Sequence, residues 1–318
     1  MKQKLLFYFI LFYSCCLYSQ VPMYRQKPID MIIYYDSLNH ITDEINYKYT
    51  RVIKDYYTQK ESYTVYEFYK SGATKMRGTT KEPESQSFVG SRIDYYENGK
   101  KKLLSNYTDY QLDGKQYEWY ENGTLKLEKE NSYTKLNKTL TTRVIQFWDK
   151  NNIHMVINGT GEFEDDNEEE FSKGKYLNGY KIAIWTGIDR KLNYSFEETY
   201  EDGSLISGKS IDAENTEYNY TILEVRPEHS KGMHDFYKYI ARNYKVPAVE
   251  GLRGKVFMSF VVEKDGSLIN FKVLRDAGYG TGEEAVRVLK NAEKWIPGKK
   301  RGVPIRVTYS LPINIQSA

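Results

Sequence analysis

The stretch YYENGKKKLLSNY, residues 95–107, decides the fold expected for most of this chain. It consists of an aromatic segment, the pair Asn98-Gly99 and a second segment rich in lysine. Asn-Gly is a strong hairpin signal, because both residues accept the positive φ angles that tight turns require. The stretch therefore predicts a β-hairpin with one packed face and one wet face.

Related stretches recur on both sides of this one. They are YEFYKSGATKMRG from Tyr66, YEWYENGTLKLEKE from Tyr117 and FEETYEDGSLISG from Phe196. Gly99 and Gly123 are 24 residues apart, and a fixed spacing of this kind indicates a repeat. The units resemble bacterial MORN-like repeats, and this resemblance implies a meander of hairpins over residues 61–211.

The aromatic positions of the repeats have two interpretations. A core between hairpins is the favoured one, and a stacking surface for sugars or peptides is the alternative. The positions concerned are Tyr96, Trp119, Tyr120 and Trp185.

Composition sets limits on fold and partner class. The chain has 318 residues, 40% of them hydrophobic, so it can bury a sizeable core. Its 31 tyrosines favour strands, and we expect a mostly β protein. The formal net charge of +3 supplies no strong field for nucleic acid or an anionic membrane.

The N-terminus reads MKQKLLFYFILFYSCCLYSQ, with two lysines ahead of an apolar run. This is the form of a secretory signal peptide, predicted over residues 1–19 and followed by an N-terminal segment over 20–60. Two alternatives stay open, namely lipidation at Cys15 or Cys16 and a retained short anchor in the inner membrane. Because these are the only cysteines, a disulfide framework and a thiolate metal site are excluded.

No motif points to catalysis, a metal or a cofactor. The acidic run EFEDDNEEEF, residues 162–171, lacks the ligand spacing and the glycine of a calcium loop, so it is interpreted as a solvated loop. The four histidines form no cluster with metal-ligand spacing. GxSxG and HExxH elements are absent, and we expect a protein that is not an enzyme.

The last hundred residues follow a different pattern. A linker is predicted over 212–221 and a separate domain over 222–318, with the order helix, strand, strand, helix, strand. The glycines of DAGYGTGEEAV, residues 276–286, raise the question of a phosphate loop. The helix after them begins with Glu283-Glu284, and these acids would repel phosphate, so the glycines are interpreted as a crossover from sheet to helix.

This C-terminal part closely resembles the C-terminal domain of TonB energy transducers, over about Val225 to Ile313. The motifs that carry the resemblance are Gly254, Asp265-Gly266, Glu283-Glu284-Ala285, Trp295-Ile296-Pro297-Gly298 and Gly302-Val303-Pro304. The resemblance implies docking onto a segment of a TonB-dependent outer-membrane receptor, which adds as a strand beside the final strand. The whole chain is therefore expected to be mostly β with an α+β C-terminal domain.

The final strand is the predicted partner-binding site. It alternates apolar and polar residues and comes last in the chain, so its outer edge can offer unpaired backbone groups. A covered or purely structural strand is the alternative. The predicted site residues are Pro304, Ile305, Arg306, Val307, Thr308, Tyr309, Ser310 and Leu311.

Two functions are weighed. The preferred one is an exported, non-enzymatic protein of the periplasm or cell envelope of a Gram-negative bacterium, which binds a partner segment by strand addition. The alternative is an inner-membrane-anchored TonB-type energy transducer that also engages motor proteins. Its anchor would have to be the short N-terminal run, and an extended proline-rich linker is not evident among eight prolines. A homodimer through the edge strand is also open.

Overall fold

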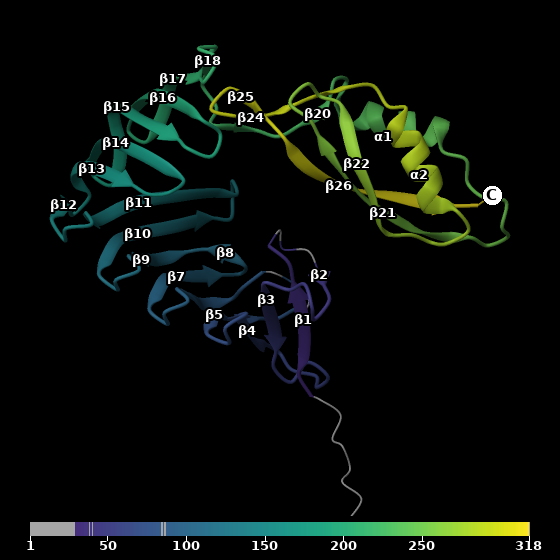
Figure 1. Cartoon of the computed structure of the whole chain (residues 1–318), viewed down its shortest axis with the longest axis horizontal. Helices are drawn as coiled ribbons and strands as arrows, with labels where there is room; N and C mark the ends of the chain where they lie inside the picture. Colours follow the sequence, from purple (N-terminus) through teal and green to yellow (C-terminus); the bar gives the residue numbers. More distant parts are fainter. Residues whose placement is uncertain (1–28, 38, 40, 84, 86, 318) are drawn as a thin grey trace, which may run out of the picture.

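The computed structural model describes residues 29–37, 39, 41–83, 85 and 87–317. The signal peptide prediction, Cys15 and Cys16 lie outside these residues. A long antiparallel sheet, here called the hairpin sheet, curves through the first two thirds of the chain, and a smaller α+β domain follows it (Figure 1). The predicted fold class, mostly β with an α+β C-terminal domain, is confirmed.

Each strand of the hairpin sheet pairs antiparallel with a strand near it in sequence, as expected for a meander of hairpins. The strands are β1 Met31–Tyr35, β2 Ile41–Thr42, β3 Tyr49–Ile53, β4 Tyr63–Tyr69, β5 Thr74–Thr80, β6 Gly90–Tyr95, β7 Lys101–Thr108, β8 Gln111–Leu112, β9 Gly114–Trp119, β10 Leu125–Thr134, β11 Thr139–Trp148, β12 His154–Ile157, β13 Thr160–Asp166, β14 Glu170–Leu177, β15 Tyr180–Asp189, β16 Tyr194–Glu201, β17 Ser204–Asp212 and β18 Glu217–Tyr220.

The turns use positive φ angles in two different ways. At Asp202-Gly203 both residues have positive φ, as predicted. At Asn98-Gly99 only the glycine does, with φ of 82°. The reason is loop length, because Tyr96 N–H bonds to Lys100 C=O, and this longer connection needs a left-handed residue only at its end.

The packed face of the hairpin sheet carries its aromatic core. Trp185 is 1% exposed and packs with Phe147, Phe163 and Tyr200. Gly174 makes room for it, since a Cβ there would lie 2.2 Å from the Trp185 ring. Trp185 is therefore a core residue, and this rules it out as part of an exposed stacking surface.

The C-terminal domain begins directly after the hairpin sheet. The predicted linker, 212–221, contains the end of β17, a turn and β18, which pairs with β17. The remaining elements are β19 Glu224–Val225, β20 Glu228–His229, α1 Gly232–Asn243, β21 Arg253–Val262, β22 Leu268–Arg275, α2 Thr281–Lys290, β23 Trp295–Ile296, β24 Gly298–Lys300, β25 Val303–Ile305 and β26 Val307–Gln316.

The core of this domain lies between one face of a three-stranded sheet and the two helices. The sheet has the order β22-β21-β26. Phe236 and Ile240 of α1 and Leu289 of α2 pack against the buried residues of β21 and β26. The expected order of helix, strand, strand, helix, strand is present as α1, β21, β22, α2 and β26, with short strands added between them.

The glycines of residues 276–286 form the crossover from β22 to α2. Gly278 and Gly280 both have φ of 78°, and Gly280 stands at the N-terminal cap of α2. Glu284 in the first turn is already paired with Arg287, at 2.6 Å. This arrangement agrees with the interpretation of these glycines as a crossover from sheet to helix.

Across the residues that the structure describes, no helix is long and apolar enough to cross a membrane.

Candidate functional site: the free edge of the C-terminal sheet

Strand β26 forms one edge of the C-terminal sheet. It pairs antiparallel with β21 along its full length, from Val262 opposite Val307 to Arg253 opposite Gln316. In the described part of the chain no other strand pairs with it. One side of its backbone is therefore open to accept a further strand.

Pro312 shows which amides face this open side. Proline has no N–H, and the register between β21 and β26 runs across Pro312 without a shift, so its backbone faces away from β21. Because backbone groups alternate in direction along a strand, Thr308, Ser310 and Asn314 turn their N–H and C=O groups to the same free edge. The free edge therefore offers donors on both sides of one gap at Pro312.

The opposite edge of the sheet is less suited to strand addition. Pairing of β22 with β21 shifts register twice, and Asn270 in β22 has φ of 53°. Bulges of this kind twist an edge and interrupt its ladder. The long regular edge of this sheet is therefore β26.

Tyr309 holds β26 on the core. Its ring centre lies 5.6 Å from that of Phe260 and 5.0 Å from that of Trp295. Its hydroxyl reaches the sulfur of Met233 in α1 at 3.8 Å, and burial raises its pKa. The Tyr309 side chain thus packs on the core face of the sheet and does not obstruct the free edge of β26.

The structure divides the predicted site residues between two strands. Pro304 and Ile305 lie in β25 and pair with β24. Arg306 lies between the strands, with its Nε 2.8 Å from Glu263. The other five, Val307, Thr308, Tyr309, Ser310 and Leu311, form the first half of β26. The break at Arg306 carries no local sequence signal, because the apolar alternation continues across it.

The predicted site residues end at Leu311, before the far end of β26. The strand continues through Asn314 and Ile315 to Gln316, and Ile315 is 3% exposed. The alternation of apolar and polar residues does extend this far and could have been followed. Pro312 lies within this stretch, and proline is tolerated in an edge strand, where it removes only one donor.

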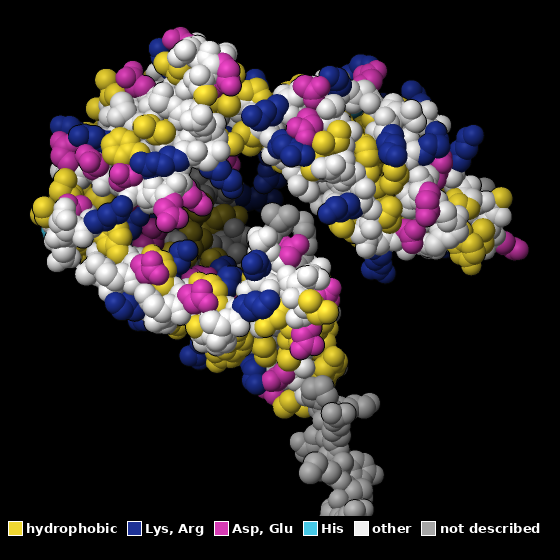
Figure 2. Space-filling model, viewed as in Figure 1, with side chains coloured by type: hydrophobic (Ala, Val, Ile, Leu, Met, Phe, Trp, Pro, Cys, Tyr) yellow, Lys and Arg dark blue, Asp and Glu magenta, His cyan; other side chains and the backbone are white. Residues whose placement is uncertain are grey.

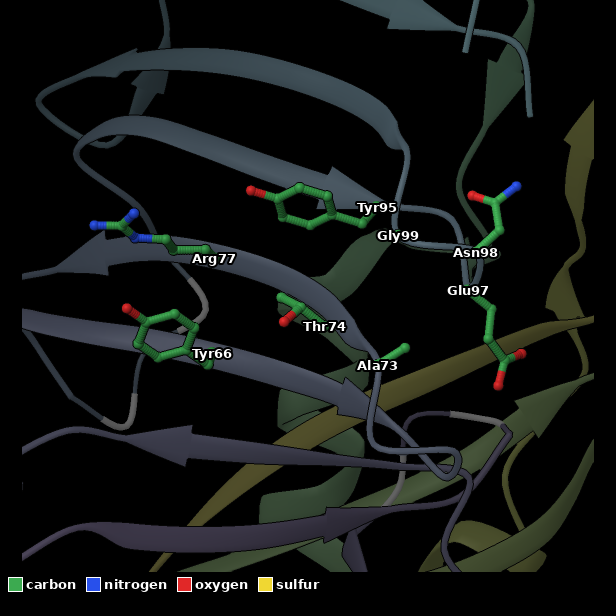
Figure 3. A pocket seen from close by; sticks show the side chains of 8 residues that line it. All are labelled: Tyr66, Ala73, Thr74, Arg77, Tyr95, Glu97, Asn98 and Gly99. Carbon is green, nitrogen blue, oxygen red and sulfur yellow. The ribbon is translucent and has the colours of Figure 1, made fainter. Parts of the chain in front are cut away.

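A hollow lies on the hairpin sheet. It has a volume of about 520 Å³, and Arg77 and Glu97 lie on opposite sides of it (Figure 3). The Arg77 guanidinium carbon is 5.9 Å from the Tyr66 ring centre. The other lining residues are Ala73, Thr74, Tyr95, Asn98 and Gly99. The carboxylate of Glu97 and the guanidinium of Arg77 point away from each other, so this hollow does not bring its charged groups together (Figure 3).

Surface charge and metal-ligating groups give no stronger site. Acidic and basic side chains are interspersed over the face shown in Figure 2, in line with the small net charge of the chain. Within the ranges that the structure describes, no group of three His, Cys, Asp or Glu residues has the arrangement of a metal site. The edge of β26 is thus the best-formed candidate for binding.

Comparison with known proteins finds a family match in the C-terminal part of the chain. Residues 247–315 match the family model of the C-terminal region of Gram-negative bacterial TonB proteins. The match begins after α1 and does not reach the hairpin sheet, so the MORN-like resemblance stays unconfirmed. No curated protein matches the chain.

The matched domain indicates the general role. It is a domain of a non-enzymatic energy-transducer family, in line with a protein that is not an enzyme. Domains of this family interact with proteins such as outer-membrane receptors and are associated with the cell envelope. Residues 247–315 thus match a TonB C-terminal domain, and this match supports a TonB-like role in envelope transport.

Proposed function

We propose that this protein is an exported, non-enzymatic protein of the Gram-negative cell envelope that binds an extended partner segment by strand addition to β26. A segment of a TonB-dependent outer-membrane receptor is the partner class proposed. The observation that carries the proposal is the free edge of β26, regular over ten residues and turning the amides of Thr308 and Ser310 outward.

The edge suits a partner that is itself extended. Main-chain hydrogen bonds to the open side of β26 would supply affinity, and side chains of alternate residues would supply specificity. The missing N–H of Pro312 fixes one position at which the added strand receives no hydrogen bond. The partner segment is proposed to pair on the Val307–Leu311 side of this gap, where the amides of Thr308 and Ser310 face outward.

A proline substitution tests this proposal. In Ser310→Pro an amide that faces the free edge is removed while the ladder to β21 is kept. The matched control is Ser310→Ala, which loses the same hydroxyl and keeps the amide. Tyr309→Pro, by contrast, removes an amide on the β21 side and is expected to unfold the domain.

The measurement is photo-cross-linking in cells, with a cross-linking residue at Thr308 and identification of the captured outer-membrane proteins by mass spectrometry. We expect receptor capture in the Ser310→Ala chain and its loss in the Ser310→Pro chain, with unchanged circular dichroism for both. Undiminished capture by a folded Ser310→Pro chain would rule out strand addition at this edge.

The alternative role is an inner-membrane-anchored energy transducer, and the N-terminus decides between the two. The intact mass of the protein from the cell envelope distinguishes them. A chain that starts near Gln20 supports the exported binder, and an acylated Cys15 or Cys16 supports a lipid-anchored one. A retained Met1 in the inner-membrane fraction favours the transducer.

A further inference from the structure

The turn between β24 and β25 enters the last strands of the hairpin sheet. Arg301 at its tip is 8% exposed, which is unusual for an arginine in a two-residue turn. Its Nε donates to Glu198 at 2.7 Å, and a terminal nitrogen donates to Glu170 at 2.9 Å. The guanidinium carbon lies 3.6 Å from the ring centre of Phe196. One side chain of the C-terminal domain thus contacts two strands of the hairpin sheet, β14 and β16.

The surroundings of the acceptor Glu198 favour its contact with Arg301. It is completely buried, and its carboxylate also accepts hydrogen bonds from the hydroxyls of Tyr200 and Tyr220, each at 3.0 Å. A buried carboxylate needs both a counter-charge and further donors. Tyr200 and Tyr220 supply donors from the hairpin sheet itself, and Arg301 supplies the charge from the other domain.

A second ion pair lies beside the first. Lys300 donates to Asp189 at 2.7 Å, and Asp189 is 3% exposed. Asp189 also accepts the backbone N–H of Leu192, at 2.8 Å. Burial opposes the charged form of Asp189, but these hydrogen bonds outweigh it and lower its pKa.

Apolar and backbone contacts complete the fit. Val303 packs with Tyr194 and Phe196 in a small core shared by the two domains. The Arg301 N–H bonds to the C=O of Leu223, in the short connection between β18 and β19. Gly302 has φ of 78°, and a Cβ there would lie 3.0 Å from Tyr218. The turn therefore fits closely against β18, with little space for a different sequence.

We infer that the end of the hairpin sheet is a dedicated docking site for this cationic turn, and that Lys300 and Arg301 with Asp189, Glu170 and Glu198 form an interdomain lock. The lock fixes the β26 edge relative to the hairpin sheet, because only six residues after Arg301 the chain enters β26 at Val307. Together with the connection through Leu223, it gives the two domains two points of attachment in place of one. Arg301 is a positioning residue in this scheme, since it acts on β26 through β25.

The experiment measures the interdomain distance in the full chain. Cys15 and Cys16 are replaced by serine, and nitroxide labels are attached to cysteines at Ser195 in β16 and Lys238 in α1, both exposed. Pulsed electron paramagnetic resonance then gives the distance distribution. We expect one narrow distance distribution in the labelled chain that keeps Arg301. In the labelled chain with Arg301→Met, we expect a distance distribution at least twice as broad.

The control is Arg306→Met. Arg306 is also an arginine near β25, but it is 54% exposed at its side chain and pairs with Glu263 inside the C-terminal domain. The distribution should stay narrow in this variant. Arg301→Lys keeps the charge and reaches one acid in place of two, so an intermediate width is expected.

A further variant guards against misfolding. Arg301→Met leaves Glu198 as a buried charge without its counter-ion, and this could unfold the last hairpins. The double variant Glu198→Gln with Arg301→Met removes that charge, so it should fold with unchanged circular dichroism and still give the broad distribution. A narrow distribution in the folded double variant would overturn the inference. The result does not depend on partner binding at β26, so it stands or falls separately from the proposed function.

Discussion

Tyr96 donates its hydroxyl hydrogen to the backbone carbonyl of Trp119 across 2.8 Å, which joins one hairpin to the next. The same contact recurs from Tyr69 to Tyr95 and from Tyr120 to Trp148. In all three cases the tyrosine begins a turn whose glycine N–H bonds back to the tyrosine carbonyl. The repeat is therefore a structural unit with its own connector, and not only a recurring turn sequence.

Removing one connector should weaken the hairpin sheet measurably. Tyr96→Phe keeps the ring and leaves the Trp119 carbonyl without this donor, so we expect a loss of about 1 kcal/mol in the free energy of unfolding. Urea denaturation followed by tryptophan fluorescence measures it. Tyr279→Phe is the control, because Tyr279 is 68% exposed. Equal stability of the two variants would show that the contact contributes nothing.

Local patterns predicted the hairpins and the C-terminal elements because the signals involved are local. The Asn-Gly turn at Asn98 and the apolar alternation of β26 each depend on residues close in sequence. The interdomain lock could not be found in this way. Arg301 and Glu198 are 103 residues apart, and a Lys-Arg-Gly turn normally indicates an exposed loop.

Burial was equally hard to derive for the aromatic residues. Trp148 is the last residue of β11 and is only partly buried, whereas Trp185 lies inside β15 and is 1% exposed. Trp185 can be buried there because Gly174 on the neighbouring strand has no side chain and leaves the space that Trp185 fills. Gly174 can be recognised as the neighbour of Trp185 only once the register of β14 and β15 is known.

Lys181 gives a prediction with a defined pH dependence. Its ammonium lies 4.0 Å from the Trp185 ring centre, and burial lowers its pKa to about 8 from 10.5. The folded state therefore disfavours the charged form, and this penalty is full below pH 8 and fades as the pH rises to 10.5. Lys181→Met should raise stability by about 1 kcal/mol at pH 7 and by less at pH 10.

Thermal unfolding at pH 7, 8.5 and 10 measures this difference, with Lys173→Met as the control because the Lys173 side chain is 57% exposed. The ring contact acts in the opposite direction, since a cation over an aromatic face is stabilising by about 0.5–1 kcal/mol. A Lys181→Met chain that is less stable at pH 7 would show that the cation–π contact outweighs desolvation.

Glu284 should govern part of the acid stability of the C-terminal domain. Hydrogen bonds from Arg287 lower its pKa to about 2 from 4.5, and the backbone N–H of Lys245 adds a further bond at 2.8 Å. A carboxyl with a depressed pKa stabilises the fold above pH 4.5, and this contribution is lost as the pH falls to 2. Glu284→Gln should therefore lower stability at pH 7 and flatten the pH dependence in this window.

Urea denaturation at pH 7, 4.5 and 2.5 follows the effect, and the expected loss at pH 7 is about 1 kcal/mol. Glu283→Gln is the matched control, because Glu283 lies in the same first turn of α2 and is exposed. If both variants showed the same loss and the same slope, the helix dipole alone would account for it, and the bonds to Arg287 and Lys245 would not.

Gly174→Ala tests how tightly the hairpin sheet is packed. The added methyl would lie 2.2 Å from the Trp185 ring, and Trp185 is enclosed by Phe163, Tyr176 and Tyr200, so it has no vacant position to move into. Overpacking of this kind costs about 1–3 kcal/mol. The free energy of unfolding from urea titration should fall by that amount. Combining Gly174→Ala with Trp185→Leu frees the space for the methyl, so the two changes together should cost less than the sum of their separate costs. Strict additivity would mean that the glycine and the tryptophan do not compete for the same volume.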